Sequence, residues 1–413
     1  METKMQHPEN AAKLDLFLAS FDLLALQSQA TETMQKKCVG AHLLSFGGFN
    51  IVFVLPFDDG TDILARLRIP GNGFDGAGSS VSDSDLEERF SSEVATLRFL
   101  KNKTSIPVPQ LYHWDCDPTN PIGTRYMLMQ RISAPLLTHV WRDVTAAGRA
   151  KIATQIANYE AELLDNPFPS IGILVDERGT VGRLGPTCTA SFLLRSNRGP
   201  FTCSKDFLLA LADAHLDLVT KSTAQWTVWR TKWSTVNGGV QALPTDYAAQ
   251  WFQLLRDAIW KLPDELPFPP PVFRLAHTDF NEGSLLVSSA EDAAIVAVLD
   301  WEGAQVLPAW DTRHGCGLSW MDWTMLSETE ADGLRMLYYD ITTDHDRWPG
   351  TSLLHFEGLL SILDSLESII SDRKGLDTMF LAWLNYAERT GEKWCSSELE
   401  GFRRLREFIE NSQ

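Results

Sequence analysis

Apolar residues recur along this chain at two different periods, and the change of period predicts where strands and helices lie. Residues 11–37 have apolar positions near helical spacing, which predicts one or two N-terminal helices that cap the first lobe. Two runs, 43–54 and 62–69, are strand-like and are separated by a turn-forming Asp-Asp-Gly segment. A helix is predicted near residues 86–101, followed by an apolar strand at 126–129. The remainder is mainly helical by period.

The change from strand-rich to helix-rich patterning near residue 132 predicts two lobes in an α+β fold. We divide the chain into an N-terminal helical extension (1–39), a small β-rich N-lobe (40–132) and a larger, mainly helical C-lobe (133–413). A chain of 413 residues is long enough for more than one hydrophobic core, which agrees with this division.

Composition narrows the class of protein. A formal net charge of −18 argues against a nucleic-acid partner, because such proteins carry a basic face. No apolar run is long enough to span a membrane, and the N-terminus has no apolar signal core. The six cysteines show no Cys-x-x-Cys spacing, which favours a reducing compartment without a zinc site. We therefore expect a cytoplasmic protein, with import into an organelle left open.

One strand and one helix predict an ion pair between them. Alternation along residues 62–69 places Arg66 and Arg68 on the same face of the strand, so the pattern alone does not separate them. Glu93 lies on the apolar face of the following helix, three residues after Phe90. A carboxylate on a buried face needs a partner, and we expect Arg66 to be that partner. The alternative is that both arginines are solvated.

The most informative stretch begins at Leu275 and ends in Asp300-Trp301-Glu302. A polar loop with His277 and Asp279 precedes two short apolar runs joined by a turn-prone segment, which predicts a β-hairpin. Asp279 and Asp300 would then lie at the same end of this hairpin. Two close carboxylates repel unless a cation lies between them or one is protonated. A bound cation suits phosphoryl transfer, in which one Asp faces the attacking hydroxyl and the other holds Mg²⁺ on the nucleotide.

The motifs His277-x-Asp279 and Asp300-Trp-Glu302 resemble the catalytic loop and the metal-binding segment of aminoglycoside phosphotransferases and choline-kinase-like enzymes, which have a protein-kinase-like fold. The resemblance implies that Asp279, in the loop with His277, is the catalytic base and that Asp300 is a Mg²⁺ ligand. The family usually has Asn five residues after the catalytic Asp, where this chain has Ser284. Ser284 and the nearby Asn281 are therefore the candidates for a second metal ligand.

The resemblance covers roughly residues 40–315, and the segments 92–100 and 105–109 look like those of fungal family members. It implies an ATP-binding cleft between the lobes. The residues expected around the nucleotide belong to a phosphate-covering loop, to the ion pair and to the hinge. They are Gly47, Gly48 and Asn50; Arg66, Arg68 and Glu93; and Met129, Gln130 and Ile132.

Glu302, Asp311 and three tryptophans have further candidate roles. Glu302 is expected either to touch the metal through water or simply to end the strand. Asp311 is expected to hold the catalytic loop, as the resemblance implies. Trp226, Trp229 and Trp233 recur at helical spacing, and a core position is favoured over a stacking platform for a ligand.

These observations predict an ATP- and Mg²⁺-dependent phosphotransferase that acts on a hydroxyl of a small molecule. Residues 301–350 are acidic on balance, with nine Asp or Glu against three Arg, which would favour a cationic substrate if they line the cleft. The alternatives are a nucleotide-binding regulatory pseudokinase and a kinase scaffold that carries out another reaction.

Overall fold

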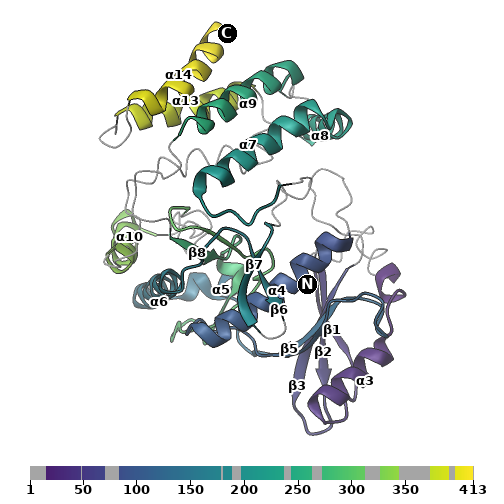
Figure 1. Cartoon of the computed structure of the whole chain (residues 1–413). Coiled ribbons are helices and arrows are strands. Elements are labelled where there is room, and N and C mark those ends of the chain that lie inside the picture. Colours follow the sequence, from purple (N-terminus) through teal and green to yellow (C-terminus); the bar gives the residue numbers. More distant parts are fainter. Residues whose placement is uncertain are drawn as a thin grey trace.

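The computed structural model describes residues 15–47, 49–69, 83–177, 180–187, 197–236, 243–262, 272–311, 326–343, 373–389 and 396–412. The predicted α+β class is confirmed. A small antiparallel sheet is built from the N-terminal part of the chain, and the remainder is mainly helical (Figure 1).

The N-terminal sheet has five antiparallel strands in the order β1-β2-β3-β5-β4. The three predicted strand runs are confirmed, while the fourth strand in sequence was not predicted. The strands are β1 (His42–Phe46), β2 (Asn50–Pro56), β3 (Asp62–Arg68), β4 (Leu111–Asp115) and β5 (Tyr126–Gln130).

Helices α3 (Leu23–Met34) and α4 (Asp83–Lys103) lie on opposite sides of this sheet (Figure 1). Side chains alternate along each strand. Ile63 and its alternate neighbours on β3 therefore pack into the same core as α3, which confirms that an N-terminal helix caps the lobe. Met127 on β5 packs with α4 into the larger core that continues into the rest of the chain. The α4 side of the sheet is thus the side that meets the C-terminal part.

The rest of the chain contributes helices and short two-stranded sheets. Helices α7, α8, α9, α13 and α14 gather at the end of the molecule far from the N-terminal sheet, and α6 packs beside α10 (Figure 1). The helices are α5 (Leu137–Val140), the 3₁₀ turn η1 (Trp141–Asp143), α6 (Ala146–Asp165), α7 (Ser204–Thr220), α8 (Thr223–Val236), α9 (Thr245–Trp260), the 3₁₀ turn η2 (Glu282–Ser284), α10 (Glu328–Thr343), α13 (Arg373–Arg389) and α14 (Ser396–Asn411). The strands are β6 (Ile173–Glu177), β7 (Thr180–Gly185), β8 (Phe273–Ala276), β9 (Leu285–Val287), β10 (Ile295–Val298) and β11 (Gln305–Pro308).

The predicted hairpin after the loop of His277 and Asp279 is confirmed, because β9 and β10 pair antiparallel. A second hairpin, β6–β7, was missed because this region was interpreted as helical and irregular. Its sequence carries the usual signal: the apolar run 171–175 is followed by Asp-Glu-Arg-Gly, a polar group ending in Gly that is typical of a hairpin turn. The hairpin packs against α4.

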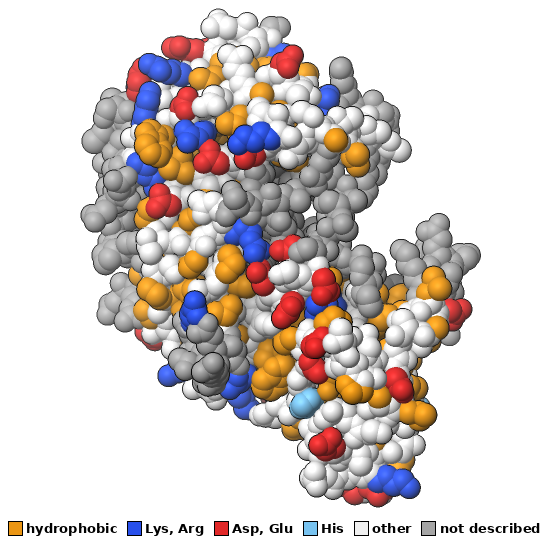
Figure 2. Space-filling view, turned by 45° about the vertical axis from the view of Figure 1, so that its right-hand side comes forward, with side chains coloured by type: hydrophobic (Ala, Val, Ile, Leu, Met, Phe, Trp, Pro, Cys, Tyr) orange, Lys and Arg blue, Asp and Glu red, His pale blue; other side chains and the backbone are white. Residues whose placement is uncertain are grey.

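Trp226 on α8 is 1% exposed and belongs to the large core, which confirms the core interpretation for this residue. The side chains of Trp229 and Trp233 lie outside the described part of the chain. Among the helices that are described, none is both long and apolar enough to cross a bilayer. On the face shown in Figure 2, acidic and basic side chains are interspersed over the described surface.

Candidate functional site

The loop between β8 and β9 holds Asp279 at the surface through its own hydrogen bonds. Asn281 Nδ2 donates to Asp279 Oδ1 at 3.2 Å, while Asn281 Oδ1 accepts from the Gly283 backbone N–H at 2.8 Å. Ser284 is buried, and its hydroxyl donates to the Asp279 backbone carbonyl at 3.2 Å. The Asp279 side chain itself is exposed. Both predicted second metal ligands therefore brace the loop that presents this carboxylate.

His277 ties this loop to the segment that carries Asp300. The side chain is 1% exposed, and its Nε2 lies 2.6 Å from the backbone carbonyl of Leu299. The imidazole packs on the Trp301 ring, with 4.5 Å between ring centroids. Burial lowers the pKa of His277, although the Leu299 carbonyl and the nearby carboxylates oppose this. A neutral His277 that donates to the Leu299 carbonyl fits these contacts. The buried side chain thus links the Asp279 loop to the segment that carries Asp300.

A second link joins the same segments, because the Leu299 backbone N–H donates to the Ser284 carbonyl at 2.7 Å. Asp300 follows directly and is exposed. Its φ angle is +57°, and Thr278 in the Asp279 loop has a φ of +37°. Non-glycine residues adopt positive φ at a cost, and such strain gathers at functional sites. The two carboxylates are thus presented by neighbouring, strained loops, as the predicted hairpin implied.

The predicted ion pair between β3 and α4 is confirmed. Arg66 pairs with Glu93 through Nη1, and both side chains are largely buried. Its Nη2 lies 2.7 Å from Glu302 Oε2, so Arg66 contacts two carboxylates. Desolvation disfavours the charged guanidinium, but Glu93, Glu302 and Asp300 together raise the pKa of Arg66 above its ordinary value. The Arg66 guanidinium is therefore protonated and is surrounded by the carboxylates of Glu93, Glu302 and Asp300.

Glu93 experiences the opposite balance. Burial raises its pKa, Arg66 lowers it, and the carboxylates of Glu302 and Asp300 raise it further, which gives a value of about 7. An unfolded Glu titrates near 4.5, so between these two pH values the folded chain binds more protons at Glu93 than the unfolded chain does. The contribution of Glu93 to stability is therefore present at low pH and is lost as the pH rises toward 7.

We expect Glu93→Gln to remove this pH dependence. The unfolding free energy of the wild type, measured by chemical denaturation, should fall relative to that of Glu93→Gln by on the order of 2–3 kcal/mol between pH 4.5 and 7. Taking the difference between the two proteins cancels other titrating groups such as His277, whose lowered pKa acts in the opposite direction. Parallel curves for the two proteins would show that Glu93 does not titrate in this range.

The position of α4, and with it Glu93, is also set from the C-terminal part of the chain. Arg198 approaches the first turns of α4, with Nη2 at 2.8 Å from Glu88 and Nη1 at 3.4 Å from Asp85. Arg125 on the N-terminal sheet binds Asp83 at 2.8 Å. Sequence reasoning missed Arg198, because the signal for such a contact between distant segments is not periodic.

We expect Arg198→Ala to weaken ATP binding by loosening α4, and to lower the unfolding free energy by about 1–2 kcal/mol, as for a partly buried ion pair. A matched control is Arg256→Ala, which removes the more exposed pair with Asp213 between α9 and α7. Calorimetric ATP titration should separate the two variants, with only Arg198→Ala losing affinity. Equal ATP affinities in both variants and the wild type would contradict the coupling.

The predicted phosphate loop lies between β1 and β2. The Gly47 backbone N–H donates to the Asn50 carbonyl at 2.9 Å, which closes a tight turn. Asn50 begins β2 and directs its side-chain amide to Glu302, with 2.7 Å between Nδ2 and Oε2. Gly48 lies outside the described residues. The described part of this loop is thus connected directly to the Asp300-Trp301-Glu302 segment.

A cavity of about 780 Å³ lies between the N-terminal sheet and the segments that carry Gly283 and Asp300. This volume is within the range of sites for small molecules and cofactors. It is lined by the predicted ion pair, by the predicted hinge and by the end of β10. Its lining includes Arg66, Glu93, Met129, Gln130, Arg131, Ile132, Ser133, Leu286, Leu299 and Asp300.

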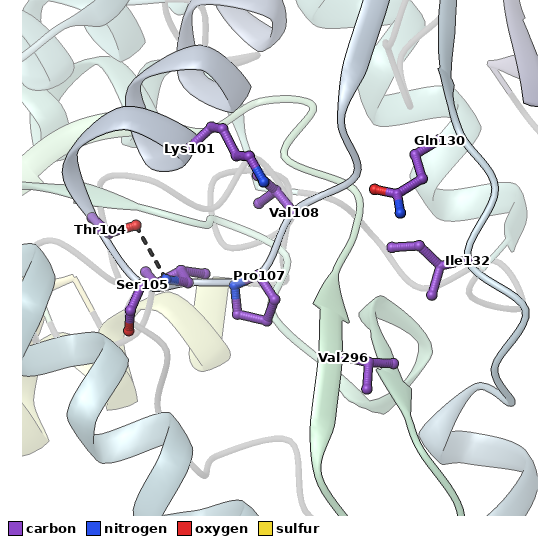
Figure 3. Close-up of a pocket in the computed structure, with 9 residues that line it drawn as sticks. Lys101, Thr104, Ser105, Pro107, Val108, Gln130, Ile132 and Val296 are labelled. Carbon is purple, nitrogen blue, oxygen red and sulfur yellow. Dashed lines mark hydrogen bonds between the residues drawn. The ribbon is translucent and has the colours of Figure 1, made fainter.

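The predicted hinge separates this cavity from a second one of about 400 Å³. Gln130 and Ile132 line both cavities, and Figure 3 shows them facing the loop around Pro107. The backbone N–H of Gln130 donates to the Gln110 carbonyl at 2.8 Å, and its side chain accepts from the Gln110 N–H at 3.2 Å. Gln130 is thus hydrogen-bonded to the residue just before β4, and the residues that follow Gln130 line the larger cavity.

Within the described residues, no group of three or more His, Cys, Asp or Glu side chains is arranged to hold a metal ion. Mg²⁺ does not require such a group, since it keeps several waters and is usually bound by one or two carboxylates together with substrate phosphates. An exposed Asp300 beside the cavity, with the oxygens of Asn281 and Ser284 on the adjoining loop, fits that type of site.

Sequence comparisons agree with this geometry. The profile of the phosphotransferase enzyme family (APH) matches residues 80–325, which is more than half of the chain. A subtelomeric hrmA-associated cluster protein of Aspergillus fumigatus is 24% identical over 315 residues, covering 66% of this chain and 59% of that protein. Altered inheritance of mitochondria protein 9 of Yarrowia lipolytica is 25% identical over 303 residues, covering 64% of this chain and 48% of that protein. The chain therefore spans less than two thirds of the length of either relative.

Solved structures with similar folds include aminoglycoside phosphotransferase APH(4)-Ia, with a TM-score of 0.42, 12% identity and coverage of 95% of this chain and 100% of the other. The GDP and kanamycin complex of APH(2″)-IIIa has a TM-score of 0.44, 14% identity and coverage of 94% and 100%. With the family profile matching across both predicted motif regions, the chain belongs to the phosphotransferase enzyme family.

Proposed function

We propose that this protein transfers the terminal phosphoryl group of ATP to a hydroxyl of a small molecule, with Mg²⁺ as the metal. The observation that carries the proposal is the arrangement around the 780 Å³ cavity. Asp300 and the buried Arg66–Glu93 pair line this cavity, and the exposed Asp279 lies on the loop that is joined to the Asp300 segment through Leu299. Phosphoryl transfer depends on this combination of positioning and charge stabilisation.

Each group has a role in the proposed reaction. Asp279 would accept the hydrogen bond of the acceptor hydroxyl, orient it and take up its proton as the new P–O bond forms and the bond from the terminal phosphorus to the departing ADP breaks. Asp300, together with Asn281 or Ser284, would hold Mg²⁺, which when bound neutralises charge on the phosphates. Arg66, kept in place by Glu93, would contact the phosphates.

The remaining residues would bind or position. His277 would act as a positioning residue, since it is buried beneath both loops and reaches neither open carboxylate. The turn of Gly47 and Gly48 would cover the phosphates, next to Asn50. Met129, Gln130 and Ile132 would form the side of the cavity that contacts the adenine base of the nucleotide. Asp311 would help hold the catalytic loop in place. Its backbone carbonyl accepts a hydrogen bond from Arg274 Nη2 at 3.1 Å, and Arg274 lies on β8, which leads into that loop.

The acceptor is proposed to be cationic, because the exposed carboxylates of Asp300, which lines the cavity, and of Asp279, on the adjoining loop, add negative potential. Part of the acidic segment that suggested this, residues 312–325 and 344–350, lies outside the described residues. For the compartment we propose the cytosol, and the mitochondrial names of the yeast relatives make mitochondria the second place to look.

A panel of small hydroxylated amines, with neutral polyols of the same size as matched controls, tests the proposal. The full-length protein is incubated with Mg²⁺ and ATP, and the products are analysed by mass spectrometry alongside ADP release. We expect an amine that gains one phosphoryl group for each ADP formed. A modified product formed without consumption of ATP would instead support a kinase scaffold used for another reaction, and ATP binding without any transfer would support a pseudokinase.

A further inference from the structure

Glu302, two residues after Asp300, binds three side chains from β2 and β3, contacts that the sequence did not predict. Arg66 Nη2 and Asn50 Nδ2 both donate to Oε2 at 2.7 Å, and Arg68 Nη1 donates to Oε1. The carboxylate therefore connects the turn after β10 to the phosphate loop and to both candidate phosphate-binding arginines.

Among the described residues, the polar partners of this carboxylate are all hydrogen-bond donors, namely two guanidinium groups and the Asn50 amide. A planar anion that accepts hydrogen bonds from two guanidinium groups makes the same kind of contact that a phosphate makes with arginine. Glu302 thus occupies an anion site in the protein without nucleotide.

Glu302 competes with an incoming anion for Arg66. Arg66 directs Nη1 to Glu93 and Nη2 to Glu302, so a phosphate that binds Arg66 through both terminal nitrogens competes with these two carboxylates. Glu93 is 5% exposed on a 21-residue helix, whereas Glu302 is 17% exposed in a turn. That turn has positive φ on both sides, at Asp300 and Gly303. Glu302 is therefore the partner that can move.

Arg68 indicates that the site fits a larger anion than a carboxylate. It is 5% exposed and stacks on Phe49, with 5.2 Å from Cζ to the ring centroid. Its Nε and Nη2 are buried without a hydrogen-bond partner among the described residues. Buried donors are normally satisfied. A polyphosphate offers more acceptor oxygens than one carboxylate and would complete them.

We propose that Glu302 is an internal substitute for phosphate. It holds Arg66 and Arg68 in the nucleotide-free protein and gives them up to the polyphosphate of the incoming nucleotide, after which the turn that carries Asp300 is released from β2 and β3. This inference rests on the proposed function, since it assumes that a polyphosphate binds in this cavity. It differs from a fixed structural link, in which Glu302 would stay on the arginines throughout.

Binding of inorganic tripolyphosphate and of ATP, both in excess EDTA, tests the exchange without any metal or turnover. Isothermal titration calorimetry is carried out on the wild type, Glu302→Ala, Glu302→Gln and Glu93→Gln. Removing a competing charged partner should make Glu302→Ala bind tripolyphosphate at least about tenfold more tightly than the wild type. Glu302→Gln should lie between them. Glu93→Gln, which removes the brace of Arg66, should bind more weakly than the wild type.

Adding Arg68→Met to Glu302→Ala should remove most of the gain, because Arg68 then no longer completes the site. If the wild type binds tripolyphosphate and both Glu302 variants bind it with equal or weaker affinity, the exchange is overturned and the proposed function still stands. If neither anion binds to the wild type or to any variant in EDTA, the exchange is overturned, and the proposed function then fails only if MgATP does not bind to the wild type either. Should Glu302→Ala not fold, as judged by circular dichroism, the gain in Glu302→Gln decides the question.

Discussion

Asp279→Asn is expected to lower the rate of phosphoryl transfer by roughly 10²–10⁴-fold, the usual contribution of a positioned general base. Asn keeps the size of the side chain and the hydrogen bond with Asn281, so the loop should keep its shape. Among the described residues, Asp279 makes no ion pair with Arg66 and no contact with Glu93. The affinity for ATP should therefore stay within about threefold of the wild type. The measurement is kcat with the best acceptor from the panel, combined with calorimetric ATP binding.

The matched control for this variant is Asp292→Asn. Asp292 lies in the turn between β9 and β10, is 60% exposed and pairs with Lys151 at 2.7 Å. It lies in the turn of the hairpin that follows the Asp279 loop and does not line the cavity. We expect its kcat to match the wild type. A kcat for Asp279→Asn above about one tenth of the wild-type value would be too large for the loss of a catalytic base.

Asp300→Asn is expected to cause the second largest loss, on the order of 10²-fold or more in kcat/KM for MgATP, because a metal ligand stabilises charge directly. Asn is chosen over Ala since Asp300 has a φ of +57°, a conformation that Asn tolerates better than most residues. The substitution thus removes the charge and leaves the turn intact. Kinetics at several Mg²⁺ concentrations should show that high Mg²⁺ recovers only part of the loss. Wild-type kcat/KM at all Mg²⁺ concentrations would exclude Asp300 as a ligand.

The contacts that could be predicted from the sequence are those set by short periods. Alternation on β3 and helical spacing on α4 each place one charged residue on a buried face, so the pairing of Arg66 with Glu93 follows once both elements are adjacent. The β9–β10 hairpin is equally local. The lobe boundary near residue 132 and the roles of the site residues remain predictions, since geometry alone assigns no role.

The contacts that could not be predicted join segments far apart in the chain through side chains without a repeating pattern. Glu302 meets Arg66 and Asn50 across more than two hundred residues, and Arg198 reaches α4 from an irregular segment. His277 illustrates another limit. Its motif indicates a catalytic loop, but only the structure shows that the ring is buried and hydrogen-bonded to Leu299.

The measurement that tests the central claim most directly is calorimetric titration of ATP with and without Mg²⁺, on the wild type and on Asp300→Asn. The account predicts that Mg²⁺ increases the ATP affinity of the wild type and that Asp300→Asn loses most of this increase while remaining folded. ATP affinity that is independent of Mg²⁺ in the wild type, or an equal Mg²⁺ effect in both proteins, would contradict a Mg²⁺–nucleotide site between Arg66 and Asp300.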